Sequence, residues 1–228
     1  MNPTPPTTES PDELSKIYQA RFQGKSAYRA AVWRILIDQL FRPWIPRGGH
    51  ILDLGAGQGE FINQVEARSK QAMDLNADTG KSLSRDVTFL QQDCSSPWKI
   101  PANSLDLVFT SNFFEHLPDK ASLKKTLQEA HRALTPGGRL VALGPNIRLL
   151  PGAYWDFWDH HLPLTELSLC EAGHLCGFQS EACWAATLPY SMSQGFQPPL
   201  FLLQIYLRLP WVWPMFGKQF LVVLRKQS

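Results

Sequence analysis

The stretch HILDLGAGQGE, residues 50–60, decides the fold of this chain. An apolar run, 50–54, is followed at once by glycines at positions 55, 57 and 59. Glycines at this spacing let the backbone turn tightly between a strand and a helix, and they let a ligand approach the main chain where a Cβ would block it. Glycine turns of this kind are also common for purely structural reasons. The stretch therefore predicts an α/β unit, and a ligand site only with support from elsewhere in the chain.

The sequence around this stretch alternates short apolar runs with helical patterns. We expect strands at 50–54, 70–74, 87–90, 105–110 and 139–144, and a final strand at 218–225. Helices are expected at 59–67, near 77–83 and at 120–134, the last stopped by Thr135-Pro136-Gly137-Gly138. Strands and helices in this order give a mostly parallel sheet with helices on both faces.

Length and composition place the chain among ordinary globular proteins. Its 228 residues are 44% hydrophobic and 18% charged, which suits one large α/β domain. A net charge of only +2 argues against a nucleic-acid partner. The four cysteines form no C-x-x-C pair, and the polar, acidic start of the chain is no signal peptide, so we expect a cytoplasmic protein. Residues 1–12 are expected to be a mobile, disordered tail, and 13–41 to form one or two amphipathic helices.

Polar residues follow several of the expected strands. Asp74 ends the second, Asp93 and Cys94 follow the third, and Asn112 follows the fourth. Because the carboxyl ends of parallel strands meet at one edge of a sheet, these side chains are expected to share a ligand site, in which Asp74 can accept hydrogen bonds from both hydroxyls of a ribose. Glu60 stands five residues after Gly55, where an anion disfavours the pyrophosphate of NAD or FAD.

Five segments in family order, DLGAGQGEF, AMDLNAD, FLQQDC, LDLVFTSNFFEHL and LTPGGRLVALGPN, resemble the class I S-adenosylmethionine-dependent methyltransferases, and among them the small bacterial methyltransferase domains. The resemblance covers about residues 50–146. It implies S-adenosyl-L-methionine as cofactor and a single-domain, Rossmann-like, seven-stranded sheet with an antiparallel last strand, for which 183–188 and 219–224 are the remaining strand candidates. It also implies cap helices at 13–47, a cofactor-binding core at 48–146, and an acceptor-binding region with the last strands at 147–228.

The resemblance also implies a set of cofactor-binding residues. Carried over by position, they are Gly55, Ala56, Gly57 and Gly59 along the methionine part, Asp53 supporting their loop, Asp74 and Leu75 at the ribose, Asp93 and Cys94 at the adenine, Asn112 and Phe113 facing the cofactor from the fourth strand, and Tyr18 from a capping helix. The implied chemistry is direct displacement at the sulfonium methyl, for which the protein mainly aligns the reactants and excludes water.

Three histidines are candidates for catalysis if the acceptor is a hydroxyl that needs a base: His116, His160 and His161. Asp156 or Asp159 could orient an imidazole, or the aromatic loop around them could simply pack while its polar groups satisfy the backbone. Two histidines and two aspartates within this loop could also bind a divalent metal, but no metal site is assigned. The spacing of Cys170, His174, Cys176 and Cys183 does not match a zinc site and favours buried thiols near a helix ending at Gly177.

The expected acceptor is a small organic molecule, such as a sugar or a lipid-linked glycan. The segment 198–216 is strongly apolar and aromatic but is interrupted by Gln204, Arg208, Pro210 and Pro214, so it lacks the 18 or more uninterrupted apolar residues of a membrane-spanning helix. It could make a peripheral membrane contact, close the pocket as a lid, or form a dimer contact. Two rival functions stay open: an NAD-dependent oxidoreductase or epimerase, and a non-catalytic module that keeps the cofactor fold.

Overall fold

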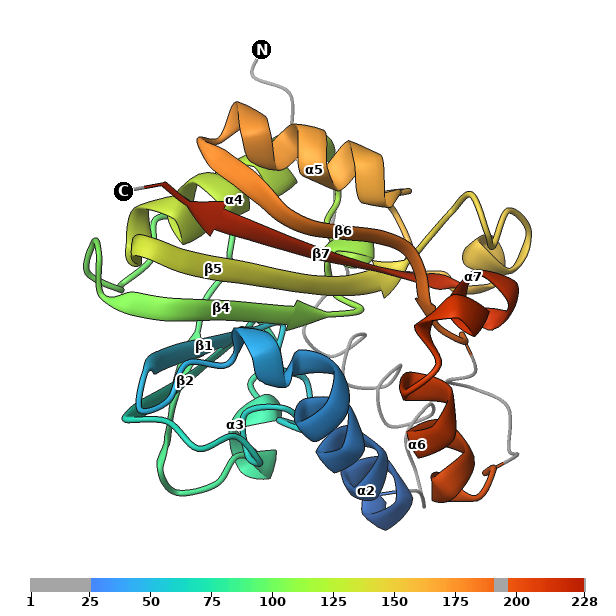
Figure 1. The fold of residues 1–228 in the computed structure, drawn as a ribbon. Helices are drawn as coiled ribbons and strands as arrows, with labels where there is room; N and C mark the ends of the chain where they lie inside the picture. Colours follow the sequence, from blue (N-terminus) through green and yellow to red (C-terminus); the bar gives the residue numbers. More distant parts are fainter. Residues whose placement is uncertain (1–25, 191–196, 228) are drawn as a thin grey trace.

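The computed structural model describes residues 26–190 and 197–227, which contain a seven-stranded sheet in the order β3-β2-β1-β4-β5-β7-β6 (Figure 1). The strands are β1 His50–Leu54, β2 Ser69–Asp74, β3 Val87–Gln91, β4 Leu105–Ser111, β5 Leu134–Pro145, β6 Phe178–Leu188 and β7 Gln219–Lys226. The first five pair in parallel, whereas β7 lies antiparallel between β5 and β6. The expected mostly parallel sheet with an antiparallel last strand is therefore confirmed.

Helices cover both faces of the sheet because successive side chains of a strand point to opposite sides. Leu52 and Leu54 of β1 belong to one buried cluster with α4 (Lys120–Ala133) and α5 (Glu166–Leu175). Ile51 belongs to the other, with α2 (Ser26–Leu36), the π-turn η1 (Ile37–Phe41) and α6 (Leu200–Leu207). Figure 1 shows α4 and α5 on one side of the sheet and α2 and α6 on the other. Strands buried on both faces explain why their sequences are almost continuously apolar.

Short elements complete the described chain: η2 (Arg42–Trp44), α3 (Thr79–Ser82), η3 (Phe114–His116), η4 (Ala153–Asp156), η5 (Pro210–Val212) and α7 (Trp213–Phe216). The helix expected to end at Gly177 is α5, and this glycine has φ +91°, which suits a helix end. Of the thiols near it, Cys170 is buried, but the residue Cys183 is exposed on β6, so the expectation of buried thiols is wrong there.

The helix expected at 59–67 does not form, and turns take its place. Gly59 has φ +73°, outside the helical range, so no helix can begin before Glu60. By Arg68 the backbone is already bonded to the Gly49 carbonyl at 2.9 Å, beside the start of β2. One helix-like bond forms here, from the Asn63 amide to the Gly59 carbonyl at 3.0 Å, and a tighter turn follows with the Gln64 amide bonded to the Phe61 carbonyl at 3.0 Å.

The helix expected at 120–134 ends within one residue of the expected stop, but the strand expected at 139–144 begins earlier. The helix α4 ends at Ala133, and β5 begins at Leu134, so residues 135–138 belong to a strand. A register shift between Leu105 and Leu107 of β4 accommodates them. A proline is tolerated at the beginning of a strand because it lacks only one ladder donor.

The segment 198–216 forms α6, η5 and α7, with Phe201 57% and Trp211 71% exposed. Within the described part of the chain, no helix has both the length and the apolar composition needed to cross a membrane. The expected tail at 1–12 and the Tyr18 assignment lie outside the described residues.

Candidate active site

The glycine loop after β1 passes close to the ends of two neighbouring strands. The Gly55 amide donates to the Met73 carbonyl at 2.9 Å, and the Gly57 amide donates to Oδ2 of Asp74 at 2.9 Å. Gly55 has φ +69°, and a Cβ built there would stand 2.8 Å from the Cβ of Phe113 and closer still to its ring. Glycine is therefore required at this position both by backbone conformation and by the close approach of Phe113.

Two acidic side chains sit beneath and beside this loop. Burial raises the pKa of Asp53 well above its usual value, the nearby Glu60 raises it further, and a backbone hydrogen bond from Ile62 opposes both effects. Glu60 forms an ion pair with Arg29 of α2, so the N-terminal helix is tied to the loop. Sequence reasoning missed Arg29, since nothing local connects position 29 with position 60. The ion pair places a cation where the sequence showed only an unpaired anion.

A first pocket lies at the carboxyl edge of β2 and β3, and we call it the carboxylate pocket. Its cavity holds about 330 Å³ and is lined by Leu54, Met73, Asp74, Leu75, Asn76, Gln92, Asp93, Cys94, Ser95, Phe113, His116, Leu117, Pro118 and Asp159. Asp74 accepts from the amides of Gly57 and Asn76, and burial nevertheless raises its pKa. Each carboxylate oxygen accepts more than one hydrogen bond, so Asp74 can also receive a ligand hydroxyl. The structure thus brings five predicted residues, 74, 75, 93, 94 and 113, to one cavity.

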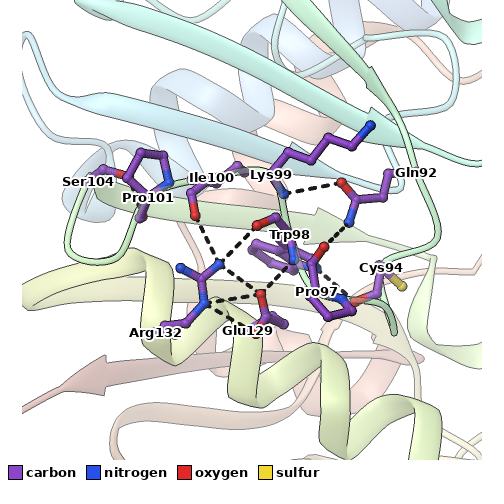
Figure 2. Close-up of polar contacts among 10 residues, drawn as sticks. All are labelled: Gln92, Cys94, Pro97, Trp98, Lys99, Ile100, Pro101, Ser104, Glu129 and Arg132. Atoms are coloured by element: carbon purple, nitrogen blue, oxygen red, sulfur yellow. Dashed lines mark hydrogen bonds and ion pairs between the residues drawn. The ribbon is translucent and has the colours of Figure 1, made fainter.

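The loop that carries Asp93 and Cys94 is attached to α4 by a polar network (Figure 2). The Trp98 indole donates to the Cys94 carbonyl at 2.8 Å, and its backbone amide donates to Glu129 at 2.7 Å. Arg132 donates to the carbonyls of Trp98 and Ile100 and pairs with Glu129. The Cys94 thiol receives a bond from Thr126, and burial raises its pKa to about 12. Cys94 is therefore a protonated wall residue of the pocket.

A second pocket lies on the other side of the glycine loop, and we call it the aromatic pocket. Its lining is Arg29, Trp33, Asp53, Gly55, Ala56, Gly57, Gln58, Glu60, Phe61, Phe109, Ser111, Asn112, Glu115, His116, Phe157, His160 and Tyr190. Phe61 and Phe109 stack with ring centroids 3.7 Å apart, and Trp33 meets Phe109 edge-on. Asn112, at φ +48°, has a buried Oδ1 with no hydrogen-bond partner in the described residues. Predicted residues 53, 55–57, 112, 116 and 160 meet here, whereas Gly59 lines neither pocket and shapes the loop instead.

A cluster of Glu115, His116 and His160 stands where the two pockets meet. One donor atom from each of the three residues lies within 4.8 Å of the others. Burial raises the pKa of Glu115 to about 7, although His116 lowers it, and the Glu115 Oε1 has no hydrogen-bond partner within the described ranges. Nδ1 of His116 lies 2.8 Å from the backbone oxygen and 3.3 Å from the carboxylate of Asp159. Asp159, one of the two aspartates expected to orient an imidazole, therefore orients the imidazole of His116.

The three candidate histidines do not converge. His116 lines both pockets and His160 lines the aromatic one, but His161 lines neither of these two described pockets. The amides of His161 and Leu162 both donate to the Glu115 carbonyl, at 2.8 and 3.0 Å. These bonds place the main chain of 160–162 beside Glu115. His160 and His161 therefore occupy different places, and the catalytic role of each stays a prediction.

Glu115 itself was missed, although it stands in the quoted FEHL segment. The available signal was an acid directly beside His116 at a strand end. Phe157 and Tyr190, which close the aromatic pocket, carried no signal of their own because their part in a pocket depends on the path of two loops.

Comparison with known proteins agrees with this geometry. The methyltransferase-domain family model matches residues 52–142. A demethylmenaquinone methyltransferase of Symbiobacterium thermophilum is 29% identical over 184 residues, which are 71% of this chain and 69% of that protein. A ubiquinone/menaquinone biosynthesis C-methyltransferase of Pseudoalteromonas translucida is 28% identical over 135 residues, 52% of each chain.

Solved structures share the fold along most of the chain. The methyltransferase in a complex with the Haloferax volcanii Trm112 activator superposes with a TM-score of 0.71 at 18% identity, covering 96% of this chain and 98% of its own. A SAM-dependent methyltransferase from Archaeoglobus fulgidus gives 0.66 at 19% identity, covering 93% and 99%. The matched family model, the relatives and the seven-stranded sheet together support a class I S-adenosylmethionine-dependent methyltransferase.

Proposed function

We propose that the chain methylates a hydroxylated aromatic acceptor, of the hydroquinone type, held in the aromatic pocket. When bound, the cofactor supplies a methyl group on a sulfonium, and the carbon–sulfur electron pair stays on sulfur as the acceptor forms its new bond. The residues of this chain bind and orient the two reactants, keep water out and receive the acceptor proton.

The residues present fit such a cofactor. The carboxylate pocket offers Asp74 and Asp93 to hydroxyl and amine donors, and 330 Å³ is within the usual range of ligand cavities. On the other side of the loop, the buried Oδ1 of Asn112 lacks a donor among the residues described, and an ammonium group would supply one. Gly55, which lines the aromatic pocket, lies directly against Phe113, which lines the carboxylate pocket. Tyr18 stays a prediction.

The observation that carries the acceptor class is the combination of flat apolar walls with one polar cluster. Trp33, Phe61, Phe109, Phe157 and Tyr190 line the aromatic pocket. Aromatic walls favour a planar apolar ring, and the cluster of Glu115, His116 and His160 can receive a hydroxyl at its edge. Two relatives carry names for methylation in menaquinone or ubiquinone synthesis. They support an acceptor of this kind above the sugar or lipid-linked glycan expected from sequence.

The test begins with the cofactor and then varies the acceptor. Titration calorimetry with S-adenosylhomocysteine is expected to show micromolar binding, and NAD none. Turnover is then measured anaerobically with a reduced naphthohydroquinone, its dimethyl ether and a monosaccharide. Methylation of the hydroquinone alone supports the proposal. Transfer to the sugar, or to the ether as readily as to the free hydroquinone, refutes the acceptor class while leaving the cofactor assignment intact.

We also propose that the 198–216 segment makes a peripheral contact with an anionic membrane. Phe201, Trp211 and their apolar neighbours on α6 and α7 are exposed. The segment contains no acidic residue, whereas Arg208 lies within it and Lys218 lies just beyond it. Exposed tryptophan beside basic side chains suits the interface of an anionic bilayer.

Sedimentation with phosphatidylserine-containing vesicles tests this contact. Phe201→Ser with Trp211→Ser should abolish binding, whereas Leu175→Ser, an equally exposed apolar residue on α5, should not. Failure of the wild-type protein to sediment, or a change from dimer to monomer in the double variant, would refute the membrane contact and favour a lid or a dimer surface.

A further inference from the structure

We infer that Glu115, His116 and His160 form a binding site for a divalent first-row transition-metal ion, at the junction of the two pockets. The inference rests on the proposed function only for what the ion does, since its binding stands on the geometry of these three side chains.

The donor set is of a kind that binds such ions. Two imidazoles and one carboxylate suit Fe²⁺, Mn²⁺, Co²⁺ or Zn²⁺, whereas Mg²⁺ and Ca²⁺ prefer oxygen alone. Donors about 2.1 Å from an ion stand no more than about 4.2 Å apart. Because the three donor atoms lie within 4.8 Å of one another, side-chain shifts of a few tenths of an ångström complete the site. It is the only group of this kind in the described residues.

Burial of Glu115 is the independent observation that points to a cation. The residue is 3% exposed, and its Oε1 has no hydrogen-bond partner in the ranges that the structure describes. A buried carboxyl oxygen without a donor is rare because it has lost its water and gained nothing. A bound cation would supply the missing partner.

The surroundings position both imidazoles for this role. Asp159, 2% exposed, engages Nδ1 of His116 through its carboxylate and its backbone oxygen, which leaves Nε2 as the donor to an ion. A histidine ligand whose other nitrogen is held by a carboxylate is the usual arrangement at protein metal sites. His160 is held by Tyr154 edge-on and by its own backbone bond to Phe157. The His116 ring is thus oriented by hydrogen bonding, and the His160 ring is packed between Tyr154 and Phe157.

The site would leave open coordination positions toward the aromatic pocket, which all three residues line. An acceptor hydroxyl bound there would lose its proton more readily, because a metal ion lowers the pKa of an oxygen that it coordinates. The same ion would hold the ring at a defined distance from the glycine loop. A metal-held hydroxyl thus explains why the polar cluster stands at the junction of the two pockets.

Cobalt binding tests the site without any assay of activity. The full-length protein is treated with a chelator, dialysed and titrated with Co²⁺ by calorimetry and visible absorption. We expect one ion per chain, with d–d bands and no thiolate charge-transfer band. Glu115→Gln and His160→Gln should each weaken binding at least tenfold, and His174→Gln, a surface histidine on α5, should not. Melting temperatures check that the variants fold, and if Glu115→Gln does not, His160→Gln decides.

Three outcomes would overturn the inference. The first is that the wild-type protein does not bind Co²⁺, and the second is that the folded Glu115 and His160 variants bind it as tightly as the wild type. The third is a thiolate charge-transfer band that disappears in Cys170→Ser, which would place the ion at the Cys170 and Cys183 sulfurs, 3.3 Å apart. Titration with S-adenosylhomocysteine in the same samples separates the two proposals. If it binds and cobalt does not, the metal site falls and the methyltransferase function stands.

Discussion

Replacing Gly55 by alanine tests the construction of the glycine loop directly. Two separate costs arise, because the backbone has φ +69° and the new Cβ would press against Phe113. A left-handed conformation costs a residue with a Cβ about 1–2 kcal/mol, and overpacking typically costs about 1–3 kcal/mol. The free energy of unfolding should therefore fall by about 2–5 kcal/mol.

Two other glycines separate these costs. Gly48 has φ +62° with open space around it, so Gly48→Ala should lose only the conformational part, about 1–2 kcal/mol. Gly152 has φ −95° and also open space, so Gly152→Ala should be neutral or stabilising by about 0.4–1 kcal/mol.

The free energy of unfolding of the three variants is measured by urea denaturation, and equal slopes m show that the variants differ in stability alone. Adding Phe113→Ala to Gly55→Ala should recover the overpacking part, which a double-mutant cycle isolates. S-adenosylhomocysteine affinity, measured in parallel, should fall with Gly55→Ala and stay unchanged with Gly152→Ala. A Gly55→Ala protein no less stable than Gly48→Ala, or one that Phe113→Ala does not relieve, would refute the close approach on which the loop's role depends.

Three further predictions concern the walls of the site. Arg132→Met should lower the free energy of unfolding by about 1–3 kcal/mol, since the Trp98 and Ile100 carbonyls lose their donor; an unchanged urea midpoint would contradict it. Asp53→Asn should raise the free energy of unfolding at neutral pH. Burial raises the pKa of Asp53 in the folded state, so the wild-type protein loses stability as the pH rises above the pKa that Asp53 has in the unfolded chain. Urea unfolding across this pH range should show a smaller loss of stability for the variant. Arg29→Gln removes the ion-pair partner of Glu60 and should weaken S-adenosylhomocysteine binding more than Arg34→Gln, a substitution at an exposed position of the same helix. Equal affinities of the two variants would show that the contact between α2 and the glycine loop does not contribute to binding.

Local patterns account for most of the predicted fold. The strands expected at 50–54 and 105–110 were predictable because a parallel strand buried on both faces is apolar along most of its length. The helix expected at 59–67 was wrong because a local pattern carries no information about the space between Gly59 and the start of β2. The same limit applies to 134–138, where a helix-stopping sequence turned out to begin a strand.

The candidate site divides in the same way. Asp74 and Asp93 were predictable from their places at strand ends, because parallel strands bring their carboxyl ends to one edge. Glu115 and Arg29 were not, since their roles come from contacts with distant segments. The bond between His116 and Asp159 joins residues 43 positions apart, and no spacing rule relates them.

The sequence by itself determined the alternation of strands and helices, the glycine loop and the family resemblance, because strand periodicity, glycine spacing and strand-end polarity are local properties of the chain. Only the tertiary structure decided which histidines share a pocket, that Glu115 is buried without a donor in the described chain, and that α2 reaches the loop through Arg29. Burial and the meeting of donor atoms depend on how loops pack after the sheet has formed. These properties come from non-local contacts, and local sequence patterns therefore do not predict them.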